Sequence, residues 1–371
     1  MSASRLGGPA FALGDLTTME SLGVQTEKGS GYGALCRWIS ERSPESSYLS
    51  IQDDSSLKTK QTSAPFPGAI GVYSSGSTGK PKLFWKDIDR LQKDCIKHPK
   101  HEACAWATCF YPSSFAGAQV AVQAVASGGS VLPLSKKWAI NHQLLLQSKP
   151  EILTATPTFL AWLAHTLKDS PVRQWQPQQI TLGGEPIRPT TAAILRDNFP
   201  SSRVTLIYAS AEMGIIAKSH RADGWFPFHS LEKRFDGWRL HDGELQVLRN
   251  NTWMQTGDLC EIRKDYFRIT GRMDRVINVG GFKVSLDDIE TKAEAFPEVA
   301  RALAFAKENP LTGHVVALIL EPSTPLRNQA LLDKILHSMH EQLPKPAWPR
   351  WIAWGKVREW NNGKRNLYPN I

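Results

Sequence analysis

Ser74-Ser-Gly-Ser-Thr-Gly-Lys-Pro-Lys82 directly follows the apolar segment Ala69-Ile-Gly-Val-Tyr73, and this loop is the most informative feature of the chain. Its small residues let backbone N–H groups converge, its hydroxyls add donors, and its lysines supply positive charge, a combination suited to a polyphosphate. The apolar segment predicts a strand, and open α/β sheets bind ligands at the carboxyl ends of their strands. The sequence therefore predicts a nucleotide-binding loop, with a flexible Gly/Ser loop that binds nothing as the alternative.

Two common phosphate-binding motifs do not fit this loop. A P-loop requires Gly-x4-Gly-Lys-Ser/Thr, but Ser77 follows Gly76 where lysine is required, and Pro81 follows Lys80. The dinucleotide-binding pattern Gly-x-Gly-x-x-Gly is also absent from this segment. If the loop at Ser74–Lys82 binds phosphate, it is therefore of a different kind from these two motifs.

The loop resembles that of the adenylate-forming superfamily, which includes acyl- and aryl-CoA synthetases, nonribosomal-peptide adenylation domains and firefly luciferase. The family form is roughly Thr-Ser-Gly-Thr-Thr-Gly-x-Pro-Lys, and here Ser74 and Ser77 replace two threonines while keeping the hydroxyls. The resemblance implies that this loop binds the phosphates of ATP. The residues to which it gives this role are Ser74, Ser75, Gly76, Ser77, Thr78, Gly79 and Lys82.

Length and composition indicate a globular protein with more than one domain. The chain has 371 residues, 41% of them hydrophobic, and contains no run of 18 apolar residues that would predict a transmembrane helix. The first residues lack a basic start followed by an apolar core, so no signal peptide is predicted. Five scattered cysteines without a Cys-x-x-Cys pair indicate a reduced, cytoplasmic setting.

The chain is basic, with a net charge of +9 at pH 7. Such a charge is compatible with nucleic acid, with coenzyme A or an acidic carrier protein, or simply with a soluble basic surface. Lysines and arginines are spread along the chain rather than clustered, which disfavours nucleic acid. We therefore expect no nucleic-acid partner and no membrane.

The order of apolar runs predicts an α/β fold with a mostly parallel sheet, because short strand-like runs alternate with longer helical patterns. The predicted strands are Ala69–Tyr73, Ala105–Cys109, Ser130–Leu134, Ile152–Ala155, Gln179–Leu182 and Val204–Tyr208. After Gly214, glycines separate short strand-like pieces, which predicts an antiparallel, β-rich subdomain. From Arg275 on we expect a small α+β module with helices at Leu286–Ala295 and Gln329–Gln342 and a strand at His314–Glu321.

The resemblance implies a division into a large domain, 1–273, and a small mobile C-terminal domain, 274–371, with the hinge at Asp274. It covers roughly residues 69 to 365. The N-terminal subdomain is shorter than is usual in the family. A homodimer or a partner chain could supply what this subdomain lacks.

Two further motifs follow predicted strands. Leu182-Gly-Gly-Glu-Pro-Ile187 resembles the family's Gly-Gly-x-x-Leu motif beside the acyl and adenine pockets, although alone it would be an ordinary turn. Tyr208-Ala-Ser-Ala-Glu212 resembles Tyr-Gly-x-Thr-Glu, in which the ring stacks on adenine and the carboxylate holds Mg²⁺. Ala211 replaces the threonine whose hydroxyl contacts the adenylate phosphate, and Ser210 is the candidate substitute. The residues implied here are Gly183, Gly184, Glu185, Tyr208, Ala209, Ser210 and Glu212.

A long motif marks the predicted junction of the two domains. Thr256-Gly-Asp258 resembles the ribose clamp, and Tyr266 to Glu290 contains Gly-Arg-x-Asp followed by Gly280-Gly281. The resemblance assigns Asp258 to the ribose hydroxyls, Arg272 to the ribose or α-phosphate, and Asp274 to the hinge. Gly280 and Gly281 would line the path of a thiol. Asn278 replaces a lysine that is common in the family.

Near the C-terminus, Asn362-Gly-Lys364-Arg365 resembles the terminal Gly-Lys motif, with a short basic tail as the alternative. By the resemblance, Lys364 contacts the substrate carboxylate and the α-phosphate. The Pro-x-Thr that usually precedes this motif is missing.

The resemblance implies ATP- and Mg²⁺-dependent activation of a small carboxylic acid and transfer of the acyl group to a thiol. Lys364, Lys82 and Glu212 are the implied catalytic residues. The segment from Phe110 to Gly117 lacks the acidic residue that binds an α-ammonium group, so an acyl or aryl acid is expected, in a pocket formed by Phe110, Phe115 and Gly183. Coenzyme A is the expected acceptor. The alternatives are the phosphopantetheine of an acyl carrier protein and a degenerate, non-catalytic nucleotide-binding module.

Overall fold

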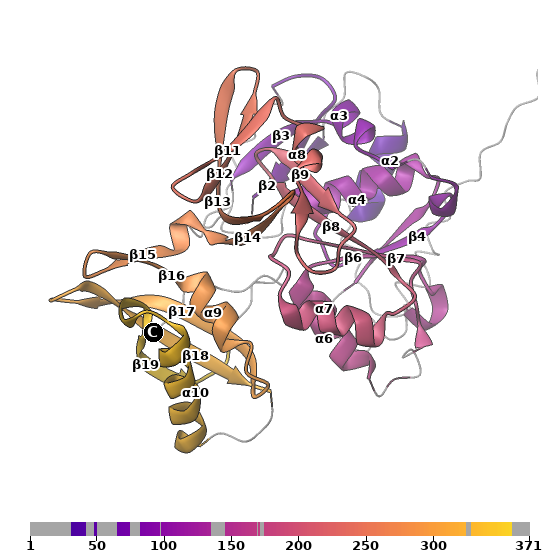
Figure 1. Ribbon diagram of the computed structural model, residues 1–371. Coiled ribbons are helices and arrows are strands. Elements are labelled where there is room, and N and C mark those ends of the chain that lie inside the picture. Colours follow the sequence, from indigo (N-terminus) through magenta and orange to yellow (C-terminus); the bar gives the residue numbers. More distant parts are fainter. Residues whose placement is uncertain are drawn as a thin grey trace, which may run out of the picture. The chain divides into compact units, whose positions relative to one another are not determined.

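The computed structural model describes residues 31–41, 48–49, 65–74, 82–96, 98–134, 145–168, 170, 174–323 and 328–357. By their contacts they form two compact units, and Figure 1 labels helices and strands of both. The first contains the described residues within Met1–Gly184 and Asn198–Ile215, and the second those within Glu185–Asp197 and Ile216–Ile371. The predicted hinge at Asp274 falls within the second unit, and the domain bounds 1–273 and 274–371 remain predictions.

The first unit is built on a sheet with the strand order β5-β4-β6-β7-β8-β9. Neighbouring strands from β5 to β8 are parallel, which confirms the predicted α/β fold with a mostly parallel sheet. All four residues of β6 are buried, as expected for a parallel strand covered on both faces. The strands are β4 (Ala105–Thr108), β5 (Ser130–Pro133), β6 (Ile152–Ala155), β7 (Gln179–Gly183), β8 (Arg203–Ser210) and β9 (Gly214–Ser219), the last of which leads into the second unit.

The predicted strand at Ala69–Tyr73 forms, but it lies in a separate sheet with the order β1-β2-β3. It is β2, which runs parallel to β1 (Tyr48–Leu49) and antiparallel to β3 (Leu83–Asp87). The phosphate loop therefore connects the two strands of a hairpin. The sequence analysis did not identify β3, although Leu83-Phe-Trp is an apolar and aromatic run of the kind that favours strands.

Helix α4 packs against both sheets of the first unit. The hydroxyl of Ser114 caps it by accepting the N–H of Gly117, and most of its side chains are buried. One part of its surface contacts Ile70 of β2, and another contacts Trp106 and Ile152 of the six-stranded sheet. The helices of this unit include α2 (Tyr32–Glu41), α3 (Ile88–Lys93), η1 (Pro99–His101), α4 (Phe115–Ala126) and α6 (Pro157–Leu167).

The second unit contains an antiparallel sheet with the order β10-β14-β13-β12-β11, which confirms the β-rich subdomain predicted after Gly214. Its strands are β10 (Phe226–Pro227), β11 (Gly237–His241), β12 (Glu244–Arg249), β13 (Thr252–Arg263) and β14 (Tyr266–Arg272). The unit also contains α7 (Pro189–Asn198), which reaches the boundary with the first unit, and α8 (His229–Glu232).

Residues 273–323 and 328–357, here called the C-terminal module, form the small α+β part predicted from the sequence. In Figure 1 it is drawn in orange and yellow. Alternate residues of β18, Val316, Leu318 and Leu320, face the helices and pack with Ile289 and Ile335. Its elements are η3 (Met273–Arg275), β15 (Val276–Val279), β16 (Phe282–Ser285), α9 (Leu286–Ala293), β17 (Val299–Asn309), β18 (Gly313–Pro322), α10 (Gln329–Gln342), η4 (Lys345–Ala347) and β19 (Pro349–Trp354).

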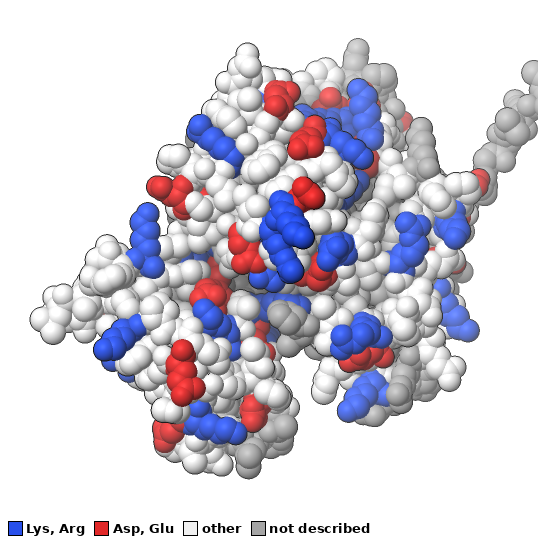
Figure 2. Space-filling model, in the orientation of Figure 1, with Lys and Arg blue, Asp and Glu red and all other residues white. Residues whose placement is uncertain are grey.

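On the face drawn in Figure 2, lysine and arginine side chains lie among aspartate and glutamate side chains. Among the described residues on this face, basic and acidic side chains are therefore interspersed. Within the described ranges, no helix is both long and apolar enough to cross a membrane.

Candidate functional site

The structure describes the two ends of the predicted phosphate loop, and they are held together. The Ser74 N–H donates to the Lys82 carbonyl oxygen (2.8 Å), and the Lys82 N–H donates to the Ser74 hydroxyl oxygen (3.2 Å). These bonds continue the β2–β3 pairing by one step and place the exposed Lys82 side chain at the base of the loop. Ser75, Gly76, Ser77, Thr78 and Gly79 lie outside the described residues.

The predicted acyl-pocket segment lies beside the base of this loop. The Tyr73 N–H donates to the Ser113 carbonyl oxygen (2.8 Å), and the Tyr32 hydroxyl donates to the Phe110 carbonyl oxygen (2.9 Å). Burial raises the pKa of Tyr32 well above its usual value, so the hydroxyl stays protonated and remains a donor. Phe115 is buried and Phe110 is half-buried. The structure thus brings the expected pocket residues Phe110 and Phe115 close to the end of β2.

The segment predicted to contact adenine and Mg²⁺ is hydrogen-bonded to the β2–β3 hairpin. Tyr208, Ala209 and Ser210 end β8, and Lys86 of β3 donates from Nζ to the Glu212 carbonyl oxygen (2.7 Å). The Glu212 side chain is exposed. Mg²⁺ is commonly held by one or two carboxylates together with substrate phosphates, so this single carboxylate fits the predicted role. No group of three or more His, Cys, Asp or Glu that could hold a metal ion occurs among the described residues.

The alanine that replaces the family's threonine is a core residue here. Ala211 is 8% exposed and belongs to the same apolar cluster as Phe115 and Ile215. The neighbouring Ser210 hydroxyl accepts the Met213 N–H (3.0 Å), which leaves its own proton able to donate. Ser210 can therefore supply one donor at this turn in place of the missing threonine.

The first glycine of the pair, Gly183, ends β7, and the second, Gly184, is where the chain leaves the first unit. A side chain at Gly183 would lie 2.9 Å from the Ile207 carbonyl oxygen of β8, so the neighbouring strand requires glycine there. Gly184 has a φ of +84°, and Glu185, half-buried, begins the second unit. This packing is sufficient to explain Gly183, so the glycine alone does not indicate a ligand.

In the second unit, the expected ribose and phosphate residues lie opposite each other on β13 and β14. The strand register pairs Asp258 with Arg272, and Arg272 Nη1 donates to Asp258 Oδ1 at 3.0 Å. The Asp258 side chain is 11% exposed and that of Arg272 is 41% exposed. Burial lowers the pKa of Arg272, but Asp258 and Asp274 raise it by more, so the guanidinium stays charged. The pair offers an acceptor for sugar hydroxyls beside a cation for a phosphate.

The predicted hinge and thiol-path residues lie just after this pair. Asp274 is exposed in η3, and its Oδ1 lies 3.4 Å from Arg272 Nε. Gly280 and Gly281, with φ values of +58° and +91°, form the turn between β15 and β16, and such two-residue turns favour glycine. Asn278 Oδ1 accepts the Gly281 N–H at 2.7 Å. The asparagine that departs from the family pattern therefore stabilises this turn.

A group of charged residues around α9 was not selected from the sequence. Arg275, 6% exposed, pairs with Glu290 and donates from Nε to Asp287 Oδ1 at 2.8 Å. Arg188, from the segment after the double glycine, pairs with Glu294. The sequence signal that could have revealed this group is the spacing of Asp287, Glu290 and Glu294. This spacing puts the three acidic residues on one side of a helix whose neighbouring positions are apolar.

The backbone of β17 also depends on these carboxylates. Glu290 Oε1 accepts the Ala304 N–H (2.9 Å), and Glu294 Oε1 accepts the Ala302 N–H (2.8 Å). Buried carboxylates with such contacts are stable when a cation is paired with them, and costly when that cation is removed. Lys364, the predicted catalytic lysine, lies outside the described residues.

A protein-family model matches more than half of this chain. Residues 25–252 match the family described as AMP-binding enzyme. The D-alanine–D-alanyl carrier protein ligase of Staphylococcus epidermidis is 23% identical in an alignment of 323 positions that covers 76% of this chain and 66% of that protein. An acetyl-coenzyme A synthetase of Xylella fastidiosa is 32% identical over 108 residues, 28% of this chain and 16% of that one.

Solved structures share the fold at low sequence identity. The anthranilate CoA ligase AuaEII in complex with anthranoyl-AMP has a TM-score of 0.63 and 17% identity, covering 80% of this chain and 65% of that one. ATP-bound MatB from Rhodopseudomonas palustris also has a TM-score of 0.63 and 17% identity, covering 80% and 66%. The chain thus spans just under two thirds of the length of these relatives.

Proposed function

Because the chain belongs to the AMP-binding enzyme family, we propose that it uses MgATP to convert a carboxylic acid into an acyl-adenylate and then transfers the acyl group to a thiol. Family membership confirms the resemblance first seen in the phosphate loop. The observation that carries the proposal is the Asp258–Arg272 pair, since it joins an acceptor for ribose hydroxyls to a cation for phosphate. The closed base of the Ser74–Lys82 loop supports it.

In the proposed first step, a substrate carboxylate oxygen attacks the α-phosphorus of ATP, and the bond to the oxygen that bridges to the β-phosphate breaks. Positioning and charge neutralisation supply most of the catalysis in such a displacement. Lys82 and the loop donors would neutralise the departing pyrophosphate, and Glu212 would hold Mg²⁺, which supplies further positive charge when bound. Lys364 would hold the carboxylate against the α-phosphate.

In the proposed second step, a thiol sulfur attacks the acyl carbon and AMP leaves. Family resemblance implies that the part of the chain after Asp274 rotates between the steps. Rotation would withdraw Lys364 and bring the Gly280-Gly281 turn to the thiol. Glycines leave room there for a pantetheine arm.

We propose an acyl or aryl acid as the substrate, because the segment beside the loop offers Phe110 and Phe115 and no acidic side chain for an α-ammonium group. A pyrophosphate-exchange panel of aromatic acids, aliphatic acids and D-alanine tests this choice. We expect exchange with an aromatic or aliphatic acid. Exchange with D-alanine alone would contradict the substrate class, and a protein that neither binds MgATP nor exchanges with any acid would contradict the proposed activity.

Coenzyme A is the proposed acceptor, and a carrier-protein phosphopantetheine is the second candidate. The second is favoured by the relatives named as D-alanyl carrier protein ligases. Thioester formation with coenzyme A and with a phosphopantetheinylated carrier protein, measured side by side, distinguishes them. We expect the faster reaction with coenzyme A.

We expect Asp258→Asn to weaken MgATP binding by about 10- to 100-fold, because a hydrogen bond to a charged group contributes about 1.5–3 kcal/mol. Asparagine keeps the shape and can still accept from Arg272, so the strand pairing should persist. Calorimetric titration with MgATP measures the effect. The control is Asp223→Asn, which loses an exposed pairing with Arg221 and should bind normally. Equal affinity of the Asp258 variant and wild type would exclude Asp258 from the nucleotide site.

A further inference from the structure

Arg188 connects the segment after the double glycine to helix α9. It lies four residues beyond Gly184, its guanidinium pairs with Glu294, and Arg188 Nη2 is 3.6 Å from Glu290 Oε2. Its side chain is 19% exposed, so the pairing is largely shielded from water. A cation from the segment implied to border the adenine pocket is thus fixed to the C-terminal module.

From Arg188, contacts continue to the nucleotide residues. Glu290 also pairs with Arg275, which donates to Oδ1 of Asp287. The other oxygen of Asp287, Oδ2, accepts the backbone N–H of Arg272 at 2.8 Å. Arg272 in turn pairs with Asp258. One run of ion pairs and hydrogen bonds therefore joins Arg188 to the proposed ribose and phosphate residues.

Because the carboxylates that pair with Arg188 are buried, the paired arrangement is strongly favoured over one in which Arg188 has moved away. Glu290 is 1% exposed and Glu294 is 6% exposed, and both carboxylates also accept β17 backbone N–H groups. Moving Arg188 away would remove a cation from a buried, negatively charged pair, which is costly until water or another cation replaces it. Packed cores change between discrete arrangements rather than deforming gradually, and Glu290 and Glu294 are as buried as core residues.

We propose that Arg188 is a positioning residue for nucleotide activation. By pairing with Glu290 and Glu294, it holds α9, and through Asp287 the backbone of Arg272, in the arrangement that binds MgATP. Its release accompanies the change to the thiol-transfer arrangement. This inference rests on the proposed function and adds a residue that does not itself contact the nucleotide.

The test compares Arg188→Met with wild type and with Arg188→Lys. Methionine keeps much of the side-chain volume and removes the charge. We expect the MgATP dissociation constant, measured by calorimetry, and the KM for ATP in pyrophosphate exchange to rise about tenfold, as for one lost charged contact. Thiol transfer from a supplied acyl-adenylate should keep its wild-type rate or become faster. Arg188→Lys should restore most of the MgATP affinity.

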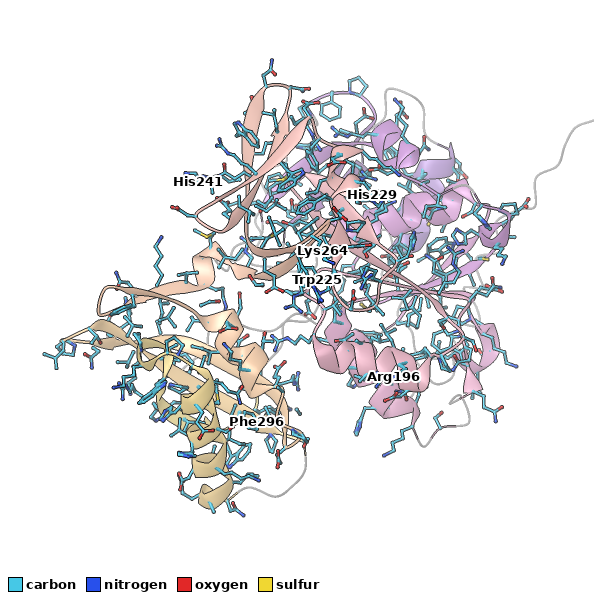
Figure 3. All side chains as sticks on the ribbon, in the orientation of Figure 1. Arg196, Trp225, His229, His241, Lys264 and Phe296 are labelled. Carbon is cyan, nitrogen blue, oxygen red and sulfur yellow. The ribbon has the colours of Figure 1, made fainter. Side chains whose placement is uncertain are left out.

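A matched control is available on the adjoining helix. Arg196 of α7, labelled in Figure 3, is 74% exposed and pairs with the neighbouring Asp197. Arg196→Met removes an arginine without disturbing a buried carboxylate, so MgATP binding should be unchanged. If Arg196→Met weakened binding as much as Arg188→Met, general surface charge would explain the effect and the proposal would be overturned.

A second variant separates positioning from folding. Arg188→Met combined with Glu294→Gln removes both charges and keeps an oxygen that can accept the Ala302 N–H. We expect this paired variant to fold and still to bind MgATP weakly. Wild-type affinity in the paired variant, or an equal fall in both half-reactions, would overturn the inference and leave the proposed function intact. Absence of MgATP binding by the wild-type protein would overturn both.

Discussion

Lys364→Ala should lower adenylate formation by about 10²- to 10³-fold, the effect typical of removing one group that stabilises charge in the transition state. The lysine would neutralise the substrate carboxylate and the α-phosphate as they approach, and alanine cannot replace that charge. Pyrophosphate exchange measures the step. Thiol transfer from a supplied acyl-adenylate should proceed at nearly the wild-type rate, because Lys364 would have withdrawn by then.

The neighbouring arginine provides the control for this variant. If residues 362–365 act merely as a basic tail, Lys364→Ala and Arg365→Ala should have equal effects. We expect the arginine variant to exchange pyrophosphate within about threefold of wild type, as for a surface charge. Full exchange activity in Lys364→Ala would refute the assignment. Loss of thiol transfer in the same variant would refute the rotation between two arrangements.

Glu290→Ala should lower the free energy of unfolding by about 3–5 kcal/mol, the usual result of removing one partner of a buried ion pair. Glu290 is 1% exposed, pairs with Arg275, and accepts the Ala304 N–H. Alanine would leave the guanidinium of Arg275, itself 6% exposed, with a reduced set of acceptors. Urea denaturation followed by tryptophan fluorescence measures the change.

Asp288 on the same helix provides the comparison. Its side chain is 51% exposed and pairs with Lys292 one turn along, so Asp288→Ala should cost no more than about 0.5 kcal/mol. Similar losses in the two variants would mean that helix propensity or the capping region, rather than the buried charges, controls the stability of α9. A Glu290→Gln variant, which retains an acceptor for Ala304, should fall between Glu290→Ala and wild type.

Strands and helices with strong periodic patterns were predicted accurately from the sequence. β6 and α10 have the predicted bounds, because a short apolar run and a regular helical spacing each point to one kind of element. β17 (Val299–Asn309) was not predicted. Its alanines and charged residues have no particular preference for strands, and its pairing with β18 along its length decides its conformation.

Within the candidate site, the sequence identified residues that stand in recognisable motifs. It did not identify residues that are distant in the sequence and pair only in the folded chain. Asp258 and Arg272 were selected because each stands in a local motif, and the β13–β14 register pairs them. Arg188 and Glu294 are 106 residues apart and belong to no shared pattern. Only the folded chain brings them together, so neither spacing nor composition could reveal the pairing.

Helix α4 couples the unfolding of the two sheets of the first unit. Because its side chains fill the space beside β2 and also beside β4 and β6, neither sheet can lose its order without exposing apolar surface of the other. Heating or denaturant should therefore melt both sheets in a single cooperative transition. Amide protons of β2 and β6 would then exchange through the same global opening and share one protection factor.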